Sequence, residues 1–313
     1  MTPDFYVVGA QKSGTTSLCS ILSTHPDVCF SVPKEPMFLC RDDPMLHPTF
    51  FVERGREWMG FDWERSRNDL IQGYERLFEN AGKHQLCGEG STTYMLSKDA
   101  PSRIYAMNPQ AKIIFILRNP VNRAYSAYWH YVREGMVSWG FEREIKFNPH
   151  RILPSGCYKR YIERYLQIFP REQIFIGLSE VFKSNKNGFV GPVLEFLGLD
   201  PRRHIEIKER RNVAKVPASL PLQLFLNCLY KVAGGQFSAE DRRDVFHDAE
   251  LNVFQKRMLR IIMLMQKVNL KNKRYPPMNS RVKQALTEYY RRENKGLAEL
   301  VGIDLEKYWG MSL

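Results

Sequence analysis

One sequence feature limits the possible folds of this chain more than any other. It is a short apolar segment that is followed directly by a glycine loop and the start of a helix. Phe5 to Val8 is rich in β-forming residues and leads into Gly9-Ala-Gln-Lys-Ser-Gly-Thr-Thr-Ser17. Thr16 to Leu22 then has the apolar spacing of a helix, which stops at His25-Pro26. A strand, a loop and a helix in this order predict an α/β fold whose sheet is parallel.

The loop resembles the nucleoside-triphosphate loop G-x-x-x-x-G-K-[ST] but differs in the position of its lysine. Gly9 and Gly14 keep the spacing, whereas Thr15 stands where the lysine that reaches the β and γ phosphates belongs. Lys12 lies inside the loop, where a cation can neutralise an oxygen that bridges a phosphate to a leaving group. The positive end of the helix predicts a phosphate site without a metal, made of the backbone N–H groups of Gly14, Thr15, Thr16 and Ser17.

Two further strands are expected after the loop. Lys112 to Leu117 is a continuous apolar run typical of a buried parallel strand, and an aromatic helix over Val121 to Val132 follows it. Gln173 to Leu178 is the next strand, preceded by a helix over Tyr158 to Phe169. The alternation predicts a central parallel sheet with flanking helices, and ligands at the carboxyl ends of its strands.

A second anion site is expected at the end of the Lys112 to Leu117 strand. Arg118 follows that strand directly, and Ser126 lies two helical turns further on, so both can grip one phosphate. Arg123 is interpreted as a surface residue in an ion pair. Two separate phosphate sites indicate a nucleotide with phosphates on both sides of its ribose.

The pattern changes to long helices in the last third of the chain. Helices are predicted over Leu220 to Val232 and Ala239 to Val268, with a gap at Gly234-Gly235. We interpret residues 214–268 as a helical insertion or lid within a single domain of residues 1–313. The methionines of this stretch are expected to pack in the core: Met258, Met263 and Met265. A charged amphipathic helix over Val282 to Leu300 is expected next.

The net charge of +12 is concentrated in one part of the chain. Residues 202–295 hold 21 Lys and Arg and 9 Asp and Glu, an excess equal to the net charge of the whole chain. This distribution indicates either an anionic ligand or a solvated helical face. The aromatic residues do not alternate with the basic ones as stacking platforms would, so nucleic acid is not an expected partner.

Cysteines and hydropathy bear on the expected compartment. The six cysteines show no C-x-x-C pair and no metal-ligand spacing with histidine, so free thiols and no metal site are expected. No run of about 18 apolar residues occurs, and the first strand begins close to Met1. We therefore expect a soluble, cytoplasmic protein without stable membrane insertion.

Two of these motifs together resemble the sulfotransferases that use 3′-phosphoadenosine 5′-phosphosulfate (PAPS). Gln11 to Thr16 is similar to the family's 5′-phosphosulfate loop, and Leu117 to Ser126 to its 3′-phosphate motif. His25-Pro-Asp-Val28 before Lys34-Glu-Pro-Met-Phe38 resembles the catalytic-glutamate segment of the heparan sulfate N- and O-sulfotransferase branch, bacterial members included. The donor has one 5′-phosphate that carries the sulfuryl group and a separate 3′-phosphate, which matches the altered loop.

The resemblance implies roles for individual residues. Lys12 would contact the bridging oxygen, and Glu35 would be the general base that takes the acceptor's proton. Arg118 and Ser126 would hold the 3′-phosphate. The remaining donor contacts would come from the loop and from two lysines near the end of the chain: Ser13, Gly14, Thr15, Thr16, Ser17, Lys271 and Lys273.

Two observations bear on which residues contact the acceptor. One is a departure from the family pattern, and the other is a second residue that could act as the base. The heparan sulfate branch usually has a lysine where Gly90 follows Glu89, so Glu89 becomes a candidate acceptor-site residue. His130 is an alternative base, although a packed histidine on the aromatic helix is the commoner outcome.

The expected activity is sulfuryl transfer to a hydroxyl or amine of a small molecule, such as a secondary metabolite or a carbohydrate or glycolipid. A P-loop kinase acting on ATP is the first alternative, opposed by the missing lysine after Gly14 and by Arg118 at the strand end. A non-catalytic anion- or glycan-binding protein on the same fold is the second.

Overall fold

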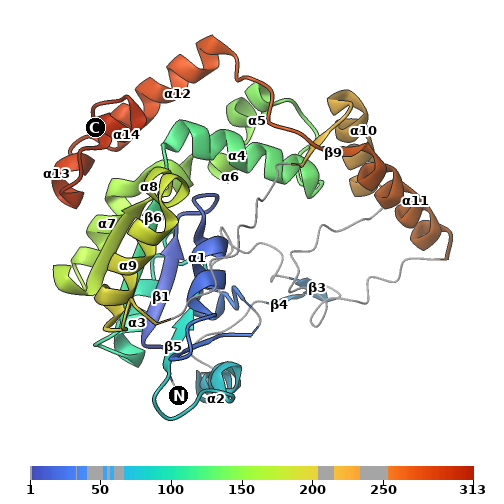
Figure 1. The fold of residues 1–313 in the computed structure, drawn as a ribbon. Helices are drawn as coiled ribbons and strands as arrows, with labels where there is room; N and C mark the ends of the chain where they lie inside the picture. Colours follow the sequence, from blue (N-terminus) through green and yellow to red (C-terminus); the bar gives the residue numbers. More distant parts are fainter. Residues whose placement is uncertain are drawn as a thin grey trace. The chain divides into compact units, whose positions relative to one another are not determined.

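A five-stranded parallel sheet in the order β2-β5-β1-β6-β7 organises the N-terminal two thirds of the chain (Figure 1). The computed structural model describes residues 2–32, 34–40, 52–54, 57–59, 67–203, 215–232 and 253–313. The predicted parallel sheet is confirmed. Its strands are β1 (Phe5–Gly9), β2 (Val28–Phe30), β5 (Leu86–Glu89), β6 (Lys112–Leu117) and β7 (Ile174–Leu178).

The central strand β1 lies between β5 and β6, and all of its residues are buried. Phe5 pairs with Gly88 of β5 and with Lys112 of β6. A Cβ on Gly88 would collide with the Phe5 ring, so glycine is required there. The predicted strands β1, β6 and β7 are confirmed, whereas β2 and β5 were not predicted because they are only three and four residues long.

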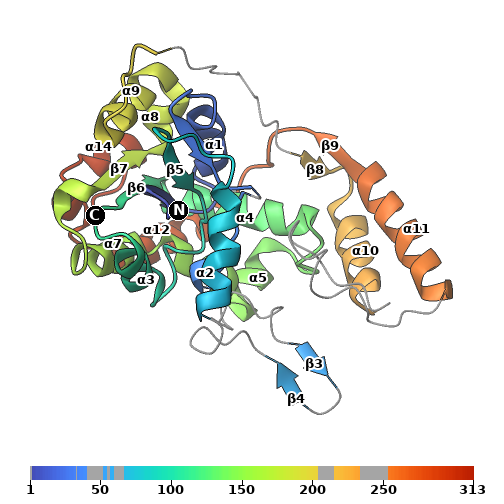
Figure 2. The same ribbon diagram turned by 90° about the horizontal axis from the view of Figure 1, so that it is seen from below.

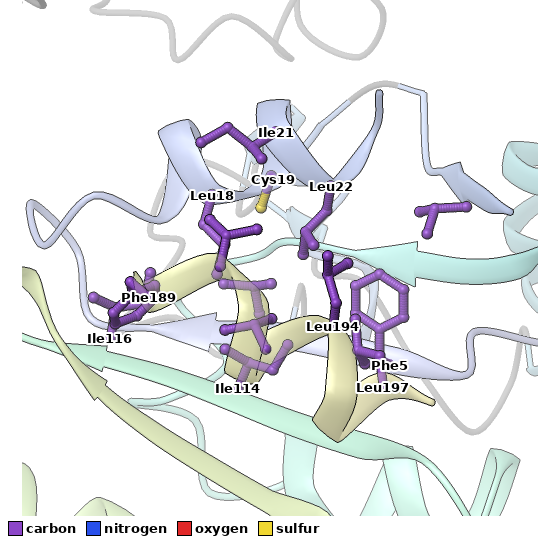
Figure 3. Close-up of a cluster of buried hydrophobic side chains, with 14 of the residues drawn as sticks. Phe5, Leu18, Cys19, Ile21, Leu22, Ile114, Ile116, Phe189, Leu194 and Leu197 are labelled. Carbon is purple, nitrogen blue, oxygen red and sulfur yellow. The ribbon is translucent and has the colours of Figure 1, made fainter. Parts of the chain in front are cut away.

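The sheet carries a core on each face. On one face, Phe5, Ile114 and Ile116 pack with residues of α1 (Thr15–Leu22) and α9 (Lys186–Leu197), as Figure 3 shows. On the other face, Phe115 meets Tyr165 of α7 (Tyr158–Leu166) edge to face, with ring centroids 5.1 Å apart. Alternate residues of β6 therefore serve opposite faces, as the pleat of a strand requires.

The chain divides into two compact units, which are described separately. The first unit comprises Met1–Pro120, Cys157–Glu209 and Tyr290–Leu313. It also holds the antiparallel pair β3 (Val52–Arg54) and β4 (Glu57–Met59). Its further helices are α2 (Arg67–Glu75), α3 (Ala100–Met107), α7 (Tyr158–Leu166), α8 (Ser179–Ser184), α13 (Leu297–Val301) and α14 (Leu305–Trp309).

The second unit comprises Val121–Gly156 and Arg210–Tyr289. Its helices α10 and α11 lie side by side (Figure 2), and β8 pairs with β9 at their base. The elements are α4 (Pro120–Arg133), which starts one residue before the unit, α5 (Phe141–Phe147), α6 (Pro149–Ile152), β8 (Lys215–Pro217), α10 (Leu220–Val232), α11 (Val253–Asn269), β9 (Leu270–Asn272) and α12 (Ser280–Glu293), which continues into the first unit.

Several predictions for the second unit can be compared with this result. The helix over Leu220 to Val232 is confirmed, and of the helix over Ala239 to Val268 the structure describes the part from Val253 on. The prediction of Met263 and Met265 in the core is wrong, since they are 53% and 46% exposed. The hairpin packs through Leu259 and Ile262 instead.

Two other predictions in this region are wrong. The helix expected over Val282 to Leu300 is two helices, because Gly296 adopts a φ of 80° between them. Arg123 is fully buried rather than on the surface, and its guanidinium donates to the carbonyl of Ile152. The single domain with an insertion stays a prediction.

None of the helices in the described ranges has the length and apolar character needed to cross a membrane. Of the six cysteines, Cys228 on α10 is exposed, Cys29 is half-buried and the other four are buried. None of the cysteines forms a disulfide, as expected.

Candidate functional site

The loop between β1 and α1 has a backbone that only a few residue types tolerate. Gly14 has a φ of 107°, and Lys12 has a φ of 67° although it is not a glycine. The loop is tied to the neighbouring strand, because the N–H of Ala10 donates to the carbonyl of Ile116 at 2.9 Å. A Cβ on Gly14 would lie 3.3 Å from the Phe182 ring, so both the conformation and the packing favour glycine.

The start of α1 has polar groups available for an anion. No side chain of the described residues caps the helix at Gly14. The hydroxyl of Ser13 is buried and has no hydrogen-bond partner among the described residues. Helix N–H groups without a cap and a buried hydroxyl without a partner together suit a bound phosphate.

The segment after β2 brings two charged side chains to this loop. Lys34 donates to the hydroxyl of Thr16 at 2.8 Å and to the carboxylate of Glu35 at 2.9 Å. Glu35 also accepts a long hydrogen bond of 3.4 Å from the hydroxyl of Thr92. The Glu35 side chain is 25% exposed, so its carboxylate is held by neighbours and still reached by solvent.

The backbone of this segment is strained at the two positions around Pro36. Glu35 has a φ of 62° and Met37 a φ of 53°. Such conformations in residues other than glycine cost about 1–3 kcal/mol each, and they persist only where the surroundings enforce them. Glu35 shares this property with Lys12, the other residue predicted to act in catalysis.

A buried hydrogen-bond chain from the end of β5 enforces that conformation. Glu89 is fully buried and accepts from the hydroxyls of Tyr74 and Ser91, the latter at 2.6 Å. The hydroxyl of Ser91 in turn accepts from the N–H of Met37 at 3.1 Å. Burial, and after it the negative charge of Glu89, raise the pKa of the Tyr74 phenol well above its usual range, so Tyr74 stays a donor. Glu89 thus positions the Glu35 segment through Ser91.

Arg118 lies at the carboxyl end of β6, as predicted, and reaches the loop. Its guanidinium donates to the carbonyl of Lys12 at 3.0 Å, and its own carbonyl accepts from the hydroxyl of Tyr158 at 2.7 Å. Partial burial, and then the Arg118 guanidinium, lower the pKa of Lys183 on α8. Lys183 therefore adds a further cation near Arg118.

Four predicted residues belong to the second unit and are described within it. Ser126 is buried on α4. The ring of His130 lies 2.9 Å from the guanidinium of Arg133, through Nδ1. Lys271 and Lys273 are exposed, at and just after β9.

The departure at Gly90 has a steric cause. A Cβ on Gly90 would lie 2.6 Å from the Sγ atom of Cys19 on α1, which is closer than such atoms approach. A lysine at this position therefore requires a smaller neighbour than cysteine. In this chain, Lys34 is the lysine that contacts Glu35.

Sequence reasoning missed Lys34 and Lys183 as members of the site. The contact of Lys34 with Thr16 joins residues 18 positions apart, which no local sequence pattern indicates. Lys183 lies on a short helix after β7, and the carboxyl-end rule for parallel strands was the signal that could have found it. Among the described residues, no group of His, Cys, Asp and Glu could hold a metal ion.

Comparison with known proteins agrees with this geometry. The model of the sulfotransferase family matches residues 3–202. The bifunctional heparan sulfate N-deacetylase/N-sulfotransferase 3 of Mus musculus is 30% identical over 214 residues, which are 64% of this chain and 22% of the relative. The human heparan sulfate glucosamine 3-O-sulfotransferase 6 is 30% identical over 208 residues, which are 63% of this chain and 52% of the relative.

The chain thus spans between about a fifth and a half of the length of these curated relatives. Among solved structures, a sulfotransferase from Alicyclobacillus acidocaldarius has a TM-score of 0.65 and 24% identity, covering 98% of this chain and 99% of that chain. This similarity shows that the two share a fold. With more than half of its residues matched by the family's model, those of the loop and of β6 among them, the chain belongs to the sulfotransferase family.

Proposed function

We propose that this chain transfers a sulfuryl group from PAPS to a hydroxyl or amine of a small-molecule acceptor. One observation carries the proposal: Lys34 lies 2.8 Å from the loop hydroxyl of Thr16 and 2.9 Å from Glu35, so the proposed base is joined to the proposed phosphate loop. Curated relatives named as an N-sulfotransferase and as a 3-O-sulfotransferase support both amine and hydroxyl acceptors. A secondary metabolite or a carbohydrate or glycolipid is the acceptor class we favour.

The residues present fit the donor. The buried hydroxyl of Ser13 and the helix start at Gly14 suit the 5′-phosphate, and Arg118 with Ser126 is proposed for the 3′-phosphate. Lys271 and Lys273 are proposed to close over the nucleotide. PAPS, when bound, supplies a sulfuryl group activated by a phosphate leaving group. The other proposed donor contacts are Lys12, Thr15, Thr16 and Ser17.

The chemistry proposed for the protein is proton removal and charge neutralisation. Glu35 takes the proton of the acceptor as its oxygen or nitrogen bonds to sulfur. Lys12 neutralises the charge left on the departing phosphate oxygen as the bond from sulfur to that oxygen breaks. Lys34 orients the Glu35 carboxylate through its hydrogen bond. The left-handed backbone of Lys12 and of Glu35 fixes both in place before the donor binds.

Glu89 and His130 remain candidates for acceptor contact on the basis of the resemblance alone. The observed partners of Glu89 give it a positioning role. A cytoplasmic location stays a prediction.

Calorimetry with adenosine 3′,5′-bisphosphate tests the nucleotide site. The wild type is expected to bind, and Lys12→Ala is expected to bind about 10- to 100-fold more weakly, since one charged hydrogen bond is lost. Lys83→Ala, at an exposed lysine away from the loop, is the matched control. Absence of binding by the wild type would overturn the proposal, and preferential binding of ATP would favour a kinase.

Transfer of ³⁵S from labelled PAPS to metabolite extracts tests the reaction. Glu35→Gln is expected to lower the rate about 10²- to 10⁴-fold while nucleotide binding persists. Nucleotide binding without transfer to any acceptor would favour a non-catalytic binding protein.

A further inference from the structure

The hairpin of α10 and α11 exposes more apolar surface than is usual for a pair of helices that faces water. On α11 these side chains are between 46% and 84% exposed. They lie outside the residues matched by the sulfotransferase family, so they are a feature that the family match leaves unexplained. They are Val253, Phe254, Ile261, Leu264, Met265 and Val268, and we name them the α11 stripe.

The α11 stripe is one continuous face. At 3.6 residues per turn, its six members fall within roughly a third of the helix circumference. Leu259 and Ile262, which are buried, lie on the opposite side. Met263 is 53% exposed but falls outside the stripe by its helical position, although it is next to Leu264 in sequence. The stripe is therefore ordered, and not a scatter of single exposed residues.

A buried network of side-chain amides fixes which face of α11 points outward. Gln266 donates to the Asn227 carbonyl oxygen at 2.8 Å, and Asn269 donates to that of Gln223 at 3.1 Å. Asn227 donates in turn to the carbonyls of Val132 and Val137, at 3.0 and 2.8 Å. Rolling α11 to hide its stripe would break these buried hydrogen bonds, each of them costly to leave unmade.

The helix is also basic. From residue 251 to residue 287 the chain has nine Lys and Arg and no Asp or Glu. On α11, Arg257, Arg260 and Lys267 are all exposed. By helical position Arg260 and Lys267 flank one edge of the stripe, and Arg257 lies within it. An apolar face with cations at its edge suits the boundary between lipid headgroups and acyl chains.

The positive charge of α11 distinguishes among the partners that could cover the α11 stripe. A second copy of the chain would bring one basic helix against another, which is unfavourable. A soluble polyanion would pair with the cations and leave the stripe in water. We propose that α11 lies flat on a bilayer surface rich in anionic lipid, with its stripe among the acyl chains and its cations at the phosphates. A helix of 17 residues with four Lys and Arg suits this parallel orientation and not a transmembrane one.

Sedimentation with lipid vesicles tests the proposal on the full chain. Vesicles of phosphatidylcholine with about one third phosphatidylglycerol are compared with pure phosphatidylcholine. The protein is expected to bind the anionic vesicles at least about tenfold more tightly, and high salt is expected to weaken this binding. Equal affinity for the two vesicles, or no binding to either, would overturn the proposal.

A matched pair of variants separates the stripe from the rest of the helix. Leu264→Ser removes a stripe residue, and Met263→Ser removes a neighbour of similar exposure on another face. Leu264→Ser is expected to weaken vesicle binding about tenfold, and Met263→Ser to leave it near the wild-type value. Arg260→Gln is expected to weaken it roughly fivefold. Both serine variants should melt like the wild type, because both positions are exposed.

If another partner covers the α11 stripe, the same experiments should give other results. Equal vesicle binding by the two serine variants, with strong binding to heparin, would overturn the proposal in favour of a soluble polyanion. Dimerisation that Leu264→Ser abolishes, without vesicle binding, would overturn it in favour of a second copy. Vesicle binding does not depend on PAPS, and the nucleotide calorimetry does not depend on α11, so either proposal can fail alone.

Discussion

The ammonium group of Lys34 lies 2.8 Å from the hydroxyl of Thr16, in the first turn of α1. This hydrogen bond joins the segment after β2 to the start of α1. The same ammonium group pairs with Glu35, so one lysine connects the proposed general base with the proposed phosphate site.

Replacing Lys34 is expected to affect turnover more than donor binding. Lys34→Met removes the hydrogen bond that orients the Glu35 carboxylate, and kcat should fall about 10- to 100-fold, while the affinity for adenosine 3′,5′-bisphosphate changes less. Lys34→Arg keeps the charge and should retain more activity. Steady-state kinetics on a labelled acceptor measures both effects, and an unchanged kcat in Lys34→Met would contradict the role.

The buried pair of Tyr74 and Glu89 is expected to matter for stability. Tyr74→Phe leaves a buried carboxylate without one of its donors, which costs about 1–3 kcal/mol of unfolding free energy. Urea denaturation measures this loss. Tyr105→Phe, at a tyrosine 42% exposed, is the control and should unfold like the wild type. Equal stability of the two variants would show that the hydrogen bond contributes little.

Gly90 and Cys19 should be energetically coupled. Gly90→Ala places a Cβ 2.6 Å from the Cys19 sulfur and should cost about 1–3 kcal/mol, whereas Cys19→Ala in the same chain should restore much of that loss. Gly73→Ala is the matched control, because its Cβ would meet no atom within 4 Å. Additive effects in a double-mutant cycle would rule out the clash.

The lowered pKa of Lys183 predicts that nucleotide binding depends on pH. Partial burial and the Arg118 guanidinium lower its pKa in the free protein, and a bound phosphate would raise that pKa again. Affinity for adenosine 3′,5′-bisphosphate should therefore be complete below the lowered pKa and fall as pH rises through it. Lys183→Arg stays charged and should remove this alkaline loss in calorimetry at several pH values. An identical pH profile in wild type and variant would exclude Lys183 from the site.

The sequence was informative where one local pattern determines the structure. The strands at β1, β6 and β7 and the helix at α10 are apolar runs long enough to show their period, and the glycine loop carries its own spacing. β2 and β5 are three and four residues long, and their place in the sheet depends on pairing with β1 and with each other. Short strands of this kind carry too few residues to show a period.

The site could be predicted in its residue types but not in its connections. Lys12, Glu35 and Arg118 follow from motifs, whereas the contact of Lys34 with Thr16 depends on how two distant segments fold. The exposed face of α11 was misread because apolar spacing alone cannot tell a face turned to the core from one turned to solvent. The buried amides of Asn227 and Asn269, which set that orientation, look in sequence like ordinary polar positions.

The distribution of thiols offers a way to observe the hairpin in solution. Burial raises the pKa of Cys19 to about 12 and that of Cys87 to about 11, so neither forms the thiolate that reacts with maleimides or iodoacetamides. Cys228, by contrast, is exposed on α10. Cys40 and Cys157 are buried as well, so after Cys29→Ser a single environment-sensitive dye can be attached to the hairpin at Cys228. The emission of this dye would show whether the hairpin has moved from water into a lipid bilayer.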